Sequence, residues 1–108
     1  MAKFEQSLYG NFDELLSRIE RGVMGGSISA SLEDTSDFYG DRSRCSVRVF
    51  ERYSAVGSNR VSLSVTLYQD ESGCIRISAI TSGGSQAVLF KVNTFGEEAF
   101  LDKLRQLL

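Results

Sequence analysis

The sequence contains no histidine, which removes the commonest general base and the commonest transition-metal ligand of proteins. A Ser-His-Asp triad is therefore excluded, although serine is abundant. Lysine is scarce as well, because Lys3, Lys91 and Lys103 are the only three, and none follows the Ser-x-x-Lys pattern that would pair it with a nucleophilic serine. The sequence favours a protein that is not an enzyme, and an enzyme with an unrecognised site stays as an alternative.

Recognisable phosphate and metal motifs are also missing. The two Gly-Gly-Ser stretches, at 25–27 and 83–85, match neither a P-loop nor a dinucleotide-binding fingerprint, and we expect them to let the chain turn. Asp37 and Asp41 fall in one predicted loop and Asp34 immediately precedes it, but their spacing matches no EF-hand, and the loop lacks the terminal glutamate of such a site. We therefore predict neither a metal nor a cofactor.

Long apolar runs are absent, and none approaches the roughly 20 residues that span a bilayer. The N-terminus has no basic segment followed by an apolar stretch, so it does not resemble a signal peptide. The two cysteines, Cys45 and Cys74, fit a reducing compartment, and the strand alternation described below predicts that they lie on opposite sheet faces, which disfavours a disulfide. We expect a cytoplasmic protein without membrane contact.

The composition that remains is that of an ordinary globular protein. The 108 residues, 42% hydrophobic and 24% charged, suffice for a single domain, residues 1–108. The net charge of −2 argues against bulk attraction to nucleic acid, so that any anion binding would need a local cluster of basic residues.

Two segments have the pattern of amphipathic helices. Asn11 and Glu14 form a capping box, and the apolar residues that follow at helical spacing are Phe12, Leu15, Leu16, Ile19 and Val23. A second capping box, Thr94 to Glu97, precedes a C-terminal helix whose apolar residues are Phe100, Leu101, Leu104, Leu107 and Leu108.

Alternating segments predict the strands. They run over residues 3–9, 27–34, 44–53, 61–67 and 75–79, and residues 35–42 are expected to form a loop. The apolar run 87–92 would suit a short strand or a helical turn, and we favour the strand. Short turns between successive strands imply antiparallel pairing. We predict an α+β two-layer sandwich, in the order β-α-β-β-β-β-(β)-α, in which two helices cover one face of a sheet of five to six strands.

The alternation also predicts which residues face away from the helices. In this assignment the outward face carries six basic and two acidic side chains, although the whole chain is acidic. The candidate ligand or interface residues on it are Arg44, Arg48, Phe50, Arg52, Arg60, Tyr68 and Arg76. Glu51 and Tyr53 have the opposite parity and would line a pocket between the sheet and the helices.

Three interpretations of this outward face stay open. An antiparallel sheet commonly solvates one face, and serine and arginine are ordinary residues there. Alternatively the arginines and aromatic rings form a surface for an anionic ligand or nucleic acid. In the third interpretation the face is a protein interface, most simply that of a symmetric homodimer. We expect a non-enzymatic interaction or ligand-binding module.

Four stretches of the chain resemble a family of short, uncharacterised proteins of Gram-positive bacteria (Firmicutes). They are Gly26–Asp34, Arg44–Tyr53, Ser78–Ser85 and Asn93–Ala99. The resemblance implies a bacterial origin and a single domain, and it supplies no site residues. The predicted order of elements is also similar to that of the helix-grip group, which includes the TATA-binding-protein-like folds. Members of that group differ in function, so this topological similarity does not select one.

Overall fold

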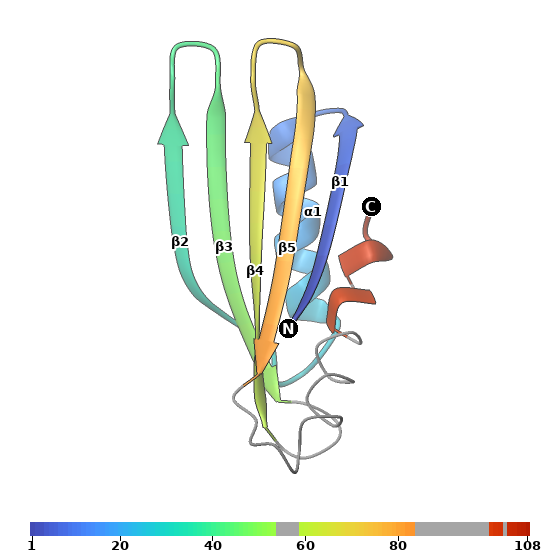
Figure 1. The fold of residues 1–108 in the computed structure, drawn as a ribbon. Helices are drawn as coiled ribbons and strands as arrows, with labels where there is room; N and C mark the ends of the chain where they lie inside the picture. The colour runs from blue at the N-terminus through green and yellow to red at the C-terminus, as the bar shows by residue number, and fades with distance from the viewer. Residues whose placement is uncertain (54–58, 84–99, 103) are drawn as a thin grey trace.

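The computed structural model describes residues 1–53, 59–83, 100–102 and 104–108. Its elements are β1 (Ala2–Tyr9), α1 (Phe12–Gly25), β2 (Ser31–Tyr39), β3 (Arg44–Tyr53), β4 (Arg60–Gln69) and β5 (Cys74–Gly83). Residues 100–102 and 104–105 are helical and belong to a C-terminal segment (Figure 1). The predicted second capping box and the predicted strand at 87–92 lie outside the described residues.

The strands form one antiparallel sheet in the order β1-β5-β4-β3-β2. The three hairpins from β2 to β5 follow each other along the chain, and β1 pairs with the last strand, with Phe4 opposite Ala79. The turn between β4 and β5 closes through a hydrogen bond from the Gly73 amide to the Asp70 carbonyl, at 3.1 Å. Gly73 has a φ of +84°, which side chains with a Cβ rarely adopt.

Helix α1 begins as the sequence predicts. The side chain of Asn11 accepts a hydrogen bond of 2.9 Å from the Glu14 amide, which satisfies one of the free donors of the first turn. The apolar face of α1 is buried, and its members are Phe12, Leu15, Leu16, Ile19 and Val23. At the far end of the helix, a Cβ added to Gly22 would lie 2.2 Å from a Leu107 methyl group, so the glycine gives the C-terminal segment room to pack on α1.

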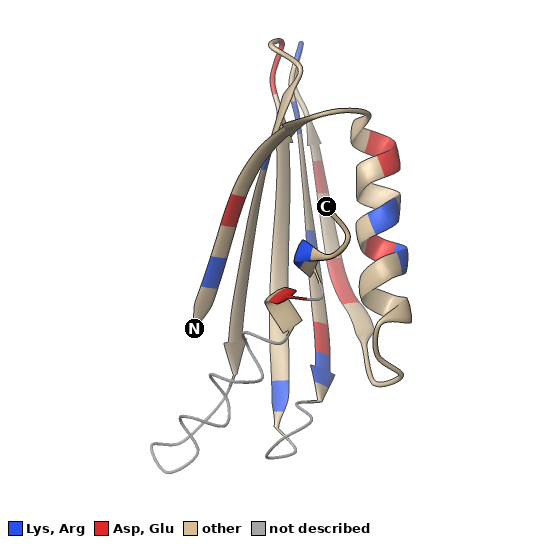
Figure 2. Cartoon of the chain, turned by 90° about the vertical axis from the view of Figure 1, so that its right-hand side faces the viewer, with Lys and Arg blue, Asp and Glu red and all other residues tan. Residues whose placement is uncertain are grey.

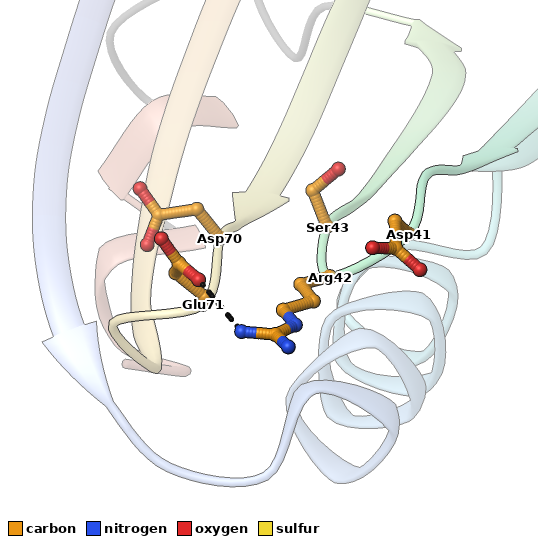
Figure 3. A pocket seen from close by; sticks show the side chains of 5 residues that line it. All are labelled: Asp41, Arg42, Ser43, Asp70 and Glu71. Carbon is orange, nitrogen blue, oxygen red and sulfur yellow. Dashed lines mark hydrogen bonds and ion pairs between the residues drawn. The ribbon is translucent and has the colours of Figure 1, made fainter.

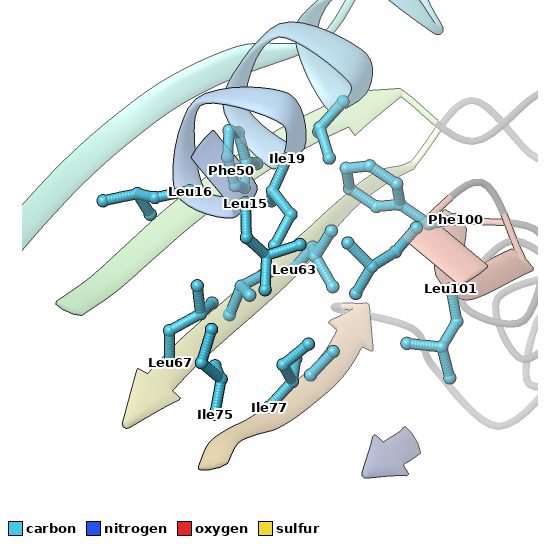
Figure 4. Packing of buried hydrophobic residues seen from close by; sticks show 14 of the residues in the cluster. Leu15, Leu16, Ile19, Phe50, Leu63, Leu67, Ile75, Ile77, Phe100 and Leu101 are labelled. Carbon is cyan, nitrogen blue, oxygen red and sulfur yellow. The ribbon is translucent and has the colours of Figure 1, made fainter. Parts of the chain in front are cut away.

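One apolar core fills the space between the sheet and both helical segments (Figure 4). Along β4 and β5 the core side chains are Val61, Leu63, Val65, Leu67, Ile75, Ile77 and Ala79. Phe100, Leu101 and Leu104 complete it from the C-terminal segment. Figure 2 shows the sheet edge-on with α1 standing on one side of it. The predicted α+β sandwich with its helices on one sheet face is therefore confirmed.

The prediction for the second strand is wrong in position. Residues 31–39 form β2, which covers most of the predicted loop, whereas residues 27–30 turn through a hydrogen bond from Ala30 to Ser27. Ile28, which the alternation placed on the apolar face, is fully exposed. β2 is an edge strand, and its residues are exposed or half-buried on both faces, so backbone pairing with β3 holds it without any apolar periodicity.

The prediction for β3 is right in extent and wrong in parity. Arg44, Ser46, Arg48, Phe50 and Arg52 face the helices, while Cys45, Val47 and Val49 lie on the opposite face. Phe50 is fully buried and stands opposite Leu63 of β4, in the middle of the core. Burying this ring removes more apolar surface from water than burying either valine alone would, and Phe50 is the residue of β3 that enters the core.

Candidate functional site: the open face of the sheet

The structure divides the seven predicted site residues between two faces. Four of them, on β3, point toward the helices: Arg44, Arg48, Phe50 and Arg52. The other three, on β4 and β5, lie on the opposite face: Arg60, Tyr68 and Arg76. The single basic face that the alternation predicted is therefore absent, and with it the basis for an anion-binding surface made of these arginines.

Arg44 and Arg52 rest on aromatic rings of the helical layer. The guanidinium carbon of Arg44 lies 4.0 Å from the centre of the Phe12 ring, and its Nη2 lies 3.1 Å from a carboxylate oxygen of Asp13. The guanidinium of Arg52 lies 4.4 Å from the Phe100 ring centre. Partial burial lowers the pKa of Arg52. Both side chains cover the margin of the core with their apolar stems.

Arg48 is the most deeply buried of the three, with 7% of its surface exposed. Its Nη1 lies 3.1 Å from a carboxylate oxygen of Asp37 on β2, and its Nε lies 3.6 Å from Glu20 of α1. The hydroxyl of Ser46 donates to Asp37 at 2.6 Å. This hydroxyl and then the Arg48 guanidinium hold the pKa of Asp37 below its ordinary value. Arg48 thus ties β2, β3 and α1 together.

The face opposite the helices is called the open face here, because no described helix covers it. Cross-strand register places its residues in rows. One row contains Ser36, Val47, Thr66, Ser78 and Glu5, and the next contains Asp34, Val49, Ser64, Ile80 and Lys3. The positions on β3, β4 and β5 in these two rows carry no charge. They form the centre of the open face: Val47, Val49, Ser64, Thr66, Ser78 and Ile80.

Charged groups surround this centre. Lys3 and Glu5 lie on the edge strand β1, Asp34 lies on the edge strand β2, and Arg76 lies toward one end of the sheet. At the other end Arg60 forms a 2.6 Å ion pair with Glu51. Glu51 and Tyr53 therefore belong to the open face, and the predicted pocket between sheet and helices that they would line is wrong.

Large apolar side chains also emerge on the open face. Phe38 of β2 stands beside Cys45 and is 65% exposed, while Ile80 of β5 and Tyr68 of β4 are 39% and 38% exposed. Both cysteines lie on this face, in contrast to the prediction, and both are free thiols. The residues that the sequence interpretation missed here are Cys45, Val47 and Val49. The signal that could have found them is Phe50, the largest apolar residue of the strand, at the opposite parity.

A recess of about 100 Å³ lies beside the centre of the open face. It is lined by Asp34, Thr35, Ser36, Val47 and Val49. The pairing of β2 with β3 shifts register between Leu32 and Asp34, where Glu33 forms a bulge. A bulge bends its strand locally, and the recess lies directly beyond it.

A second hollow lies between the tips of two hairpins and is lined by Asp41, Arg42, Ser43, Asp70 and Glu71 (Figure 3). Arg42 reaches across it to Glu71, at 3.3 Å. Asp70 accepts hydrogen bonds from the amide and hydroxyl of Ser72, which lower its pKa. The bonds between Asp70 and Ser72 stabilise one turn, and the Arg42–Glu71 pair links the two hairpin tips, so these groups have structural roles.

Two further findings concern the described part of the chain. In the part of the chain that the structure describes, no three Cys, Asp or Glu side chains are grouped so that they could hold a metal ion. None of its helices combines the length and the hydropathy needed to cross a membrane.

The sheet, its single helical layer and the uncharged centre of its open face define the class of the molecule, a two-layer α+β protein in which no described helix covers one face of the sheet. The chain belongs to a family of unknown function, DUF6054, whose model matches residues 1–108. This assignment confirms that the chain belongs to an uncharacterised family. A comparison with curated proteins finds no match.

Proposed function

We propose that this protein is a non-enzymatic interaction module of the bacterial cytoplasm, and that the open face is its binding surface for another protein. The observation that carries the proposal is the distribution of charge on that face. An uncharged centre of valine, isoleucine and small hydroxyl residues is surrounded by charged residues. Protein interfaces have the same anatomy, because charges are depleted in their buried core and retained at the rim.

A face that is merely solvated explains these residues less well. Val47 and Val49 are neighbours on it, and Ile80 and Phe38 project from it. Each of these side chains leaves apolar surface exposed to water. Burying that surface against a partner would stabilise the complex by about 25 cal/mol for each Å² removed from water. The side chains of Ser64, Thr66 and Ser78 are small, so they project little from the middle of the face. A partner with a flat surface could therefore approach the sheet closely.

The free cysteines and the resemblance to proteins of Gram-positive bacteria support the cytoplasmic and bacterial part of the proposal. An anionic ligand is not favoured, because Arg44 and Arg48 face the helices and are paired with carboxylates of the protein itself. Of the arginines on the open face, Arg60 is paired with Glu51.

Thiol labelling tests whether the open face is covered where the protein works. Cys45 lies on β3 of that face, and Cys74 lies on the same face at the start of β5. We therefore replace Cys74 with serine and introduce a reference thiol by Ser17→Cys on the exposed side of α1. We expect a maleimide to label Cys45 at least several-fold more slowly in intact cells than in dilute purified protein, relative to the thiol at position 17. Val49→Lys, which puts a charge into the centre of the face, should restore fast labelling of Cys45 in cells. Equal Cys45 rates in cells and in dilute solution would refute the proposal.

A further inference from the structure

We infer that the partner of the open face is a second copy of this chain, related by a two-fold axis that runs along β4, and that Ile80 of each copy enters the recess of the other. The inference rests on the proposed function, since it requires the open face to be a protein-binding surface. It adds which protein binds there and in which orientation.

The first step is that the face carries both halves of a complementary contact. Ile80 projects from β5, and the recess beside Val47 and Val49 lies between β2 and β3. A projection and a recess on one surface can satisfy each other twice when two copies meet about a two-fold axis.

The second step is the size of the face. Five strands about 4.8 Å apart, each about eight residues long, cover about 600 Å². Two such faces would bury about 1,200 Å², which is the lower end of the range of about 1,200–2,000 Å² for specific interfaces.

The third step fixes the axis. A two-fold axis along β4 keeps every row in place and exchanges the strands on either side, so that β5 lies over the partner's β3 and β1 over the partner's β2. Ile80 then faces Val49 in the same row, and Lys3 faces Asp34 with opposite charge. An axis across the strands would instead place β5 over β5 and leave each recess facing the other. Packed sheets cross at about 30°, which displaces the edge strands most and the pair Ile80–Val49 little.

The alternative of edge-to-edge pairing through β2 is disfavoured. Asp34 places an acidic group on that strand, and Glu33 beside it forms a bulge. Acidic residues and bulges on an edge strand discourage pairing with another copy, because like charges meet and the ladder is interrupted.

The experiment uses two single variants of the full chain, Val49→Lys and Ile80→Glu. We expect sedimentation velocity of the unmodified protein at micromolar concentrations to show a concentration-dependent dimer. Each variant alone should dimerise about 100-fold more weakly, because its charge is buried in the interface against an apolar group. An equimolar mixture should associate to within about tenfold of the unmodified protein. In the mixed dimer one contact pairs the introduced lysine with the introduced glutamate, and the other keeps the native Val49 and Ile80.

Ser17→Lys, on the exposed side of α1, is the matched control and should leave the dimer unchanged. Circular dichroism checks that both variants are folded. If the unmodified protein is a monomer, a second copy of the chain is not the partner. The Cys45 labelling experiment would then decide separately whether the open face binds another protein. If each variant is monomeric and their equimolar mixture is also monomeric, the proposed orientation of the two copies is wrong. If both variants dimerise as the unmodified protein does, the open face is not the interface.

Discussion

Replacing Phe50 with alanine is expected to lower the free energy of unfolding by about 3–5 kcal/mol. The ring is fully buried between α1, β4 and the C-terminal segment, and it stands opposite Leu63. Truncation would lose the transfer free energy of the ring and leave a cavity that the surrounding strands cannot close. Urea unfolding followed by circular dichroism measures the loss.

Val47→Ala is the matched control on the same strand. Val47 is half-buried on the open face, so the change should cost the isolated protein about 1 kcal/mol or less, measured at a concentration at which it is monomeric. If the two variants were equally destabilised, or if the order were reversed, then the inward face of β3 would be the one that the alternation of Cys45, Val47 and Val49 indicated.

Helix α1 and the strands β4 and β5 could be predicted because each has one dominant apolar face. In α1 the apolar spacing and the Asn11 cap agree, and in β4 the residues Val61 to Leu67 alternate without exception. Where local pattern and global burial agree, the sequence alone determines the element.

The prediction of the inward face of β3 was wrong because both faces of this strand contain apolar residues. Three residues, Cys45, Val47 and Val49, outnumber the single Phe50, and a count of apolar positions therefore selects the wrong face. The arginines on the inward face are tolerated because α1 supplies Asp13 and Glu20. These partners belong to another element, and strand periodicity contains no information about them.

The predicted position of β2 was wrong for a different reason. Its stability comes from backbone pairing with β3, and its side chains are largely exposed, so no burial pattern marks it. For the candidate site, the alternation of β4 and β5 correctly placed Arg60, Tyr68 and Arg76 on the open face. The recess between β2 and β3 could not be predicted, because it lies beyond the bulge at Glu33, a register shift that depends on how two strands meet.

The combined change Glu20→Gln and Asp37→Asn is expected to destabilise the protein by about 2–3 kcal/mol, because it leaves the buried Arg48 without a counter-charge. Breaking a fully buried ion pair costs about 3–5 kcal/mol. We expect less here because both carboxylate side chains are 34% exposed, so that water already screens them. Arg48→Met should cost about 1 kcal/mol or less, since it removes the buried charge itself and keeps an apolar stem of similar length. A larger loss for Arg48→Met than for the double variant would show that hydrogen bonds of Arg48 to the Ser36 and Val47 carbonyls, rather than its charge balance, determine its contribution.

The same double variant should respond less to acid. The pKa of Asp37 is lower in the folded protein than its ordinary value, so its contribution is fully present above the unfolded pKa of about 3.9 and is lost as the pH falls through that value toward the folded pKa. Between pH 7 and pH 3 the unmodified protein should therefore lose more stability than the variant in parallel urea titrations. Asp70, whose pKa is also lowered, is present in both proteins, so its share cancels in the comparison. Parallel stability curves for the two proteins would mean that the contact of Asp37 with Ser46 and Arg48 contributes nothing to folding.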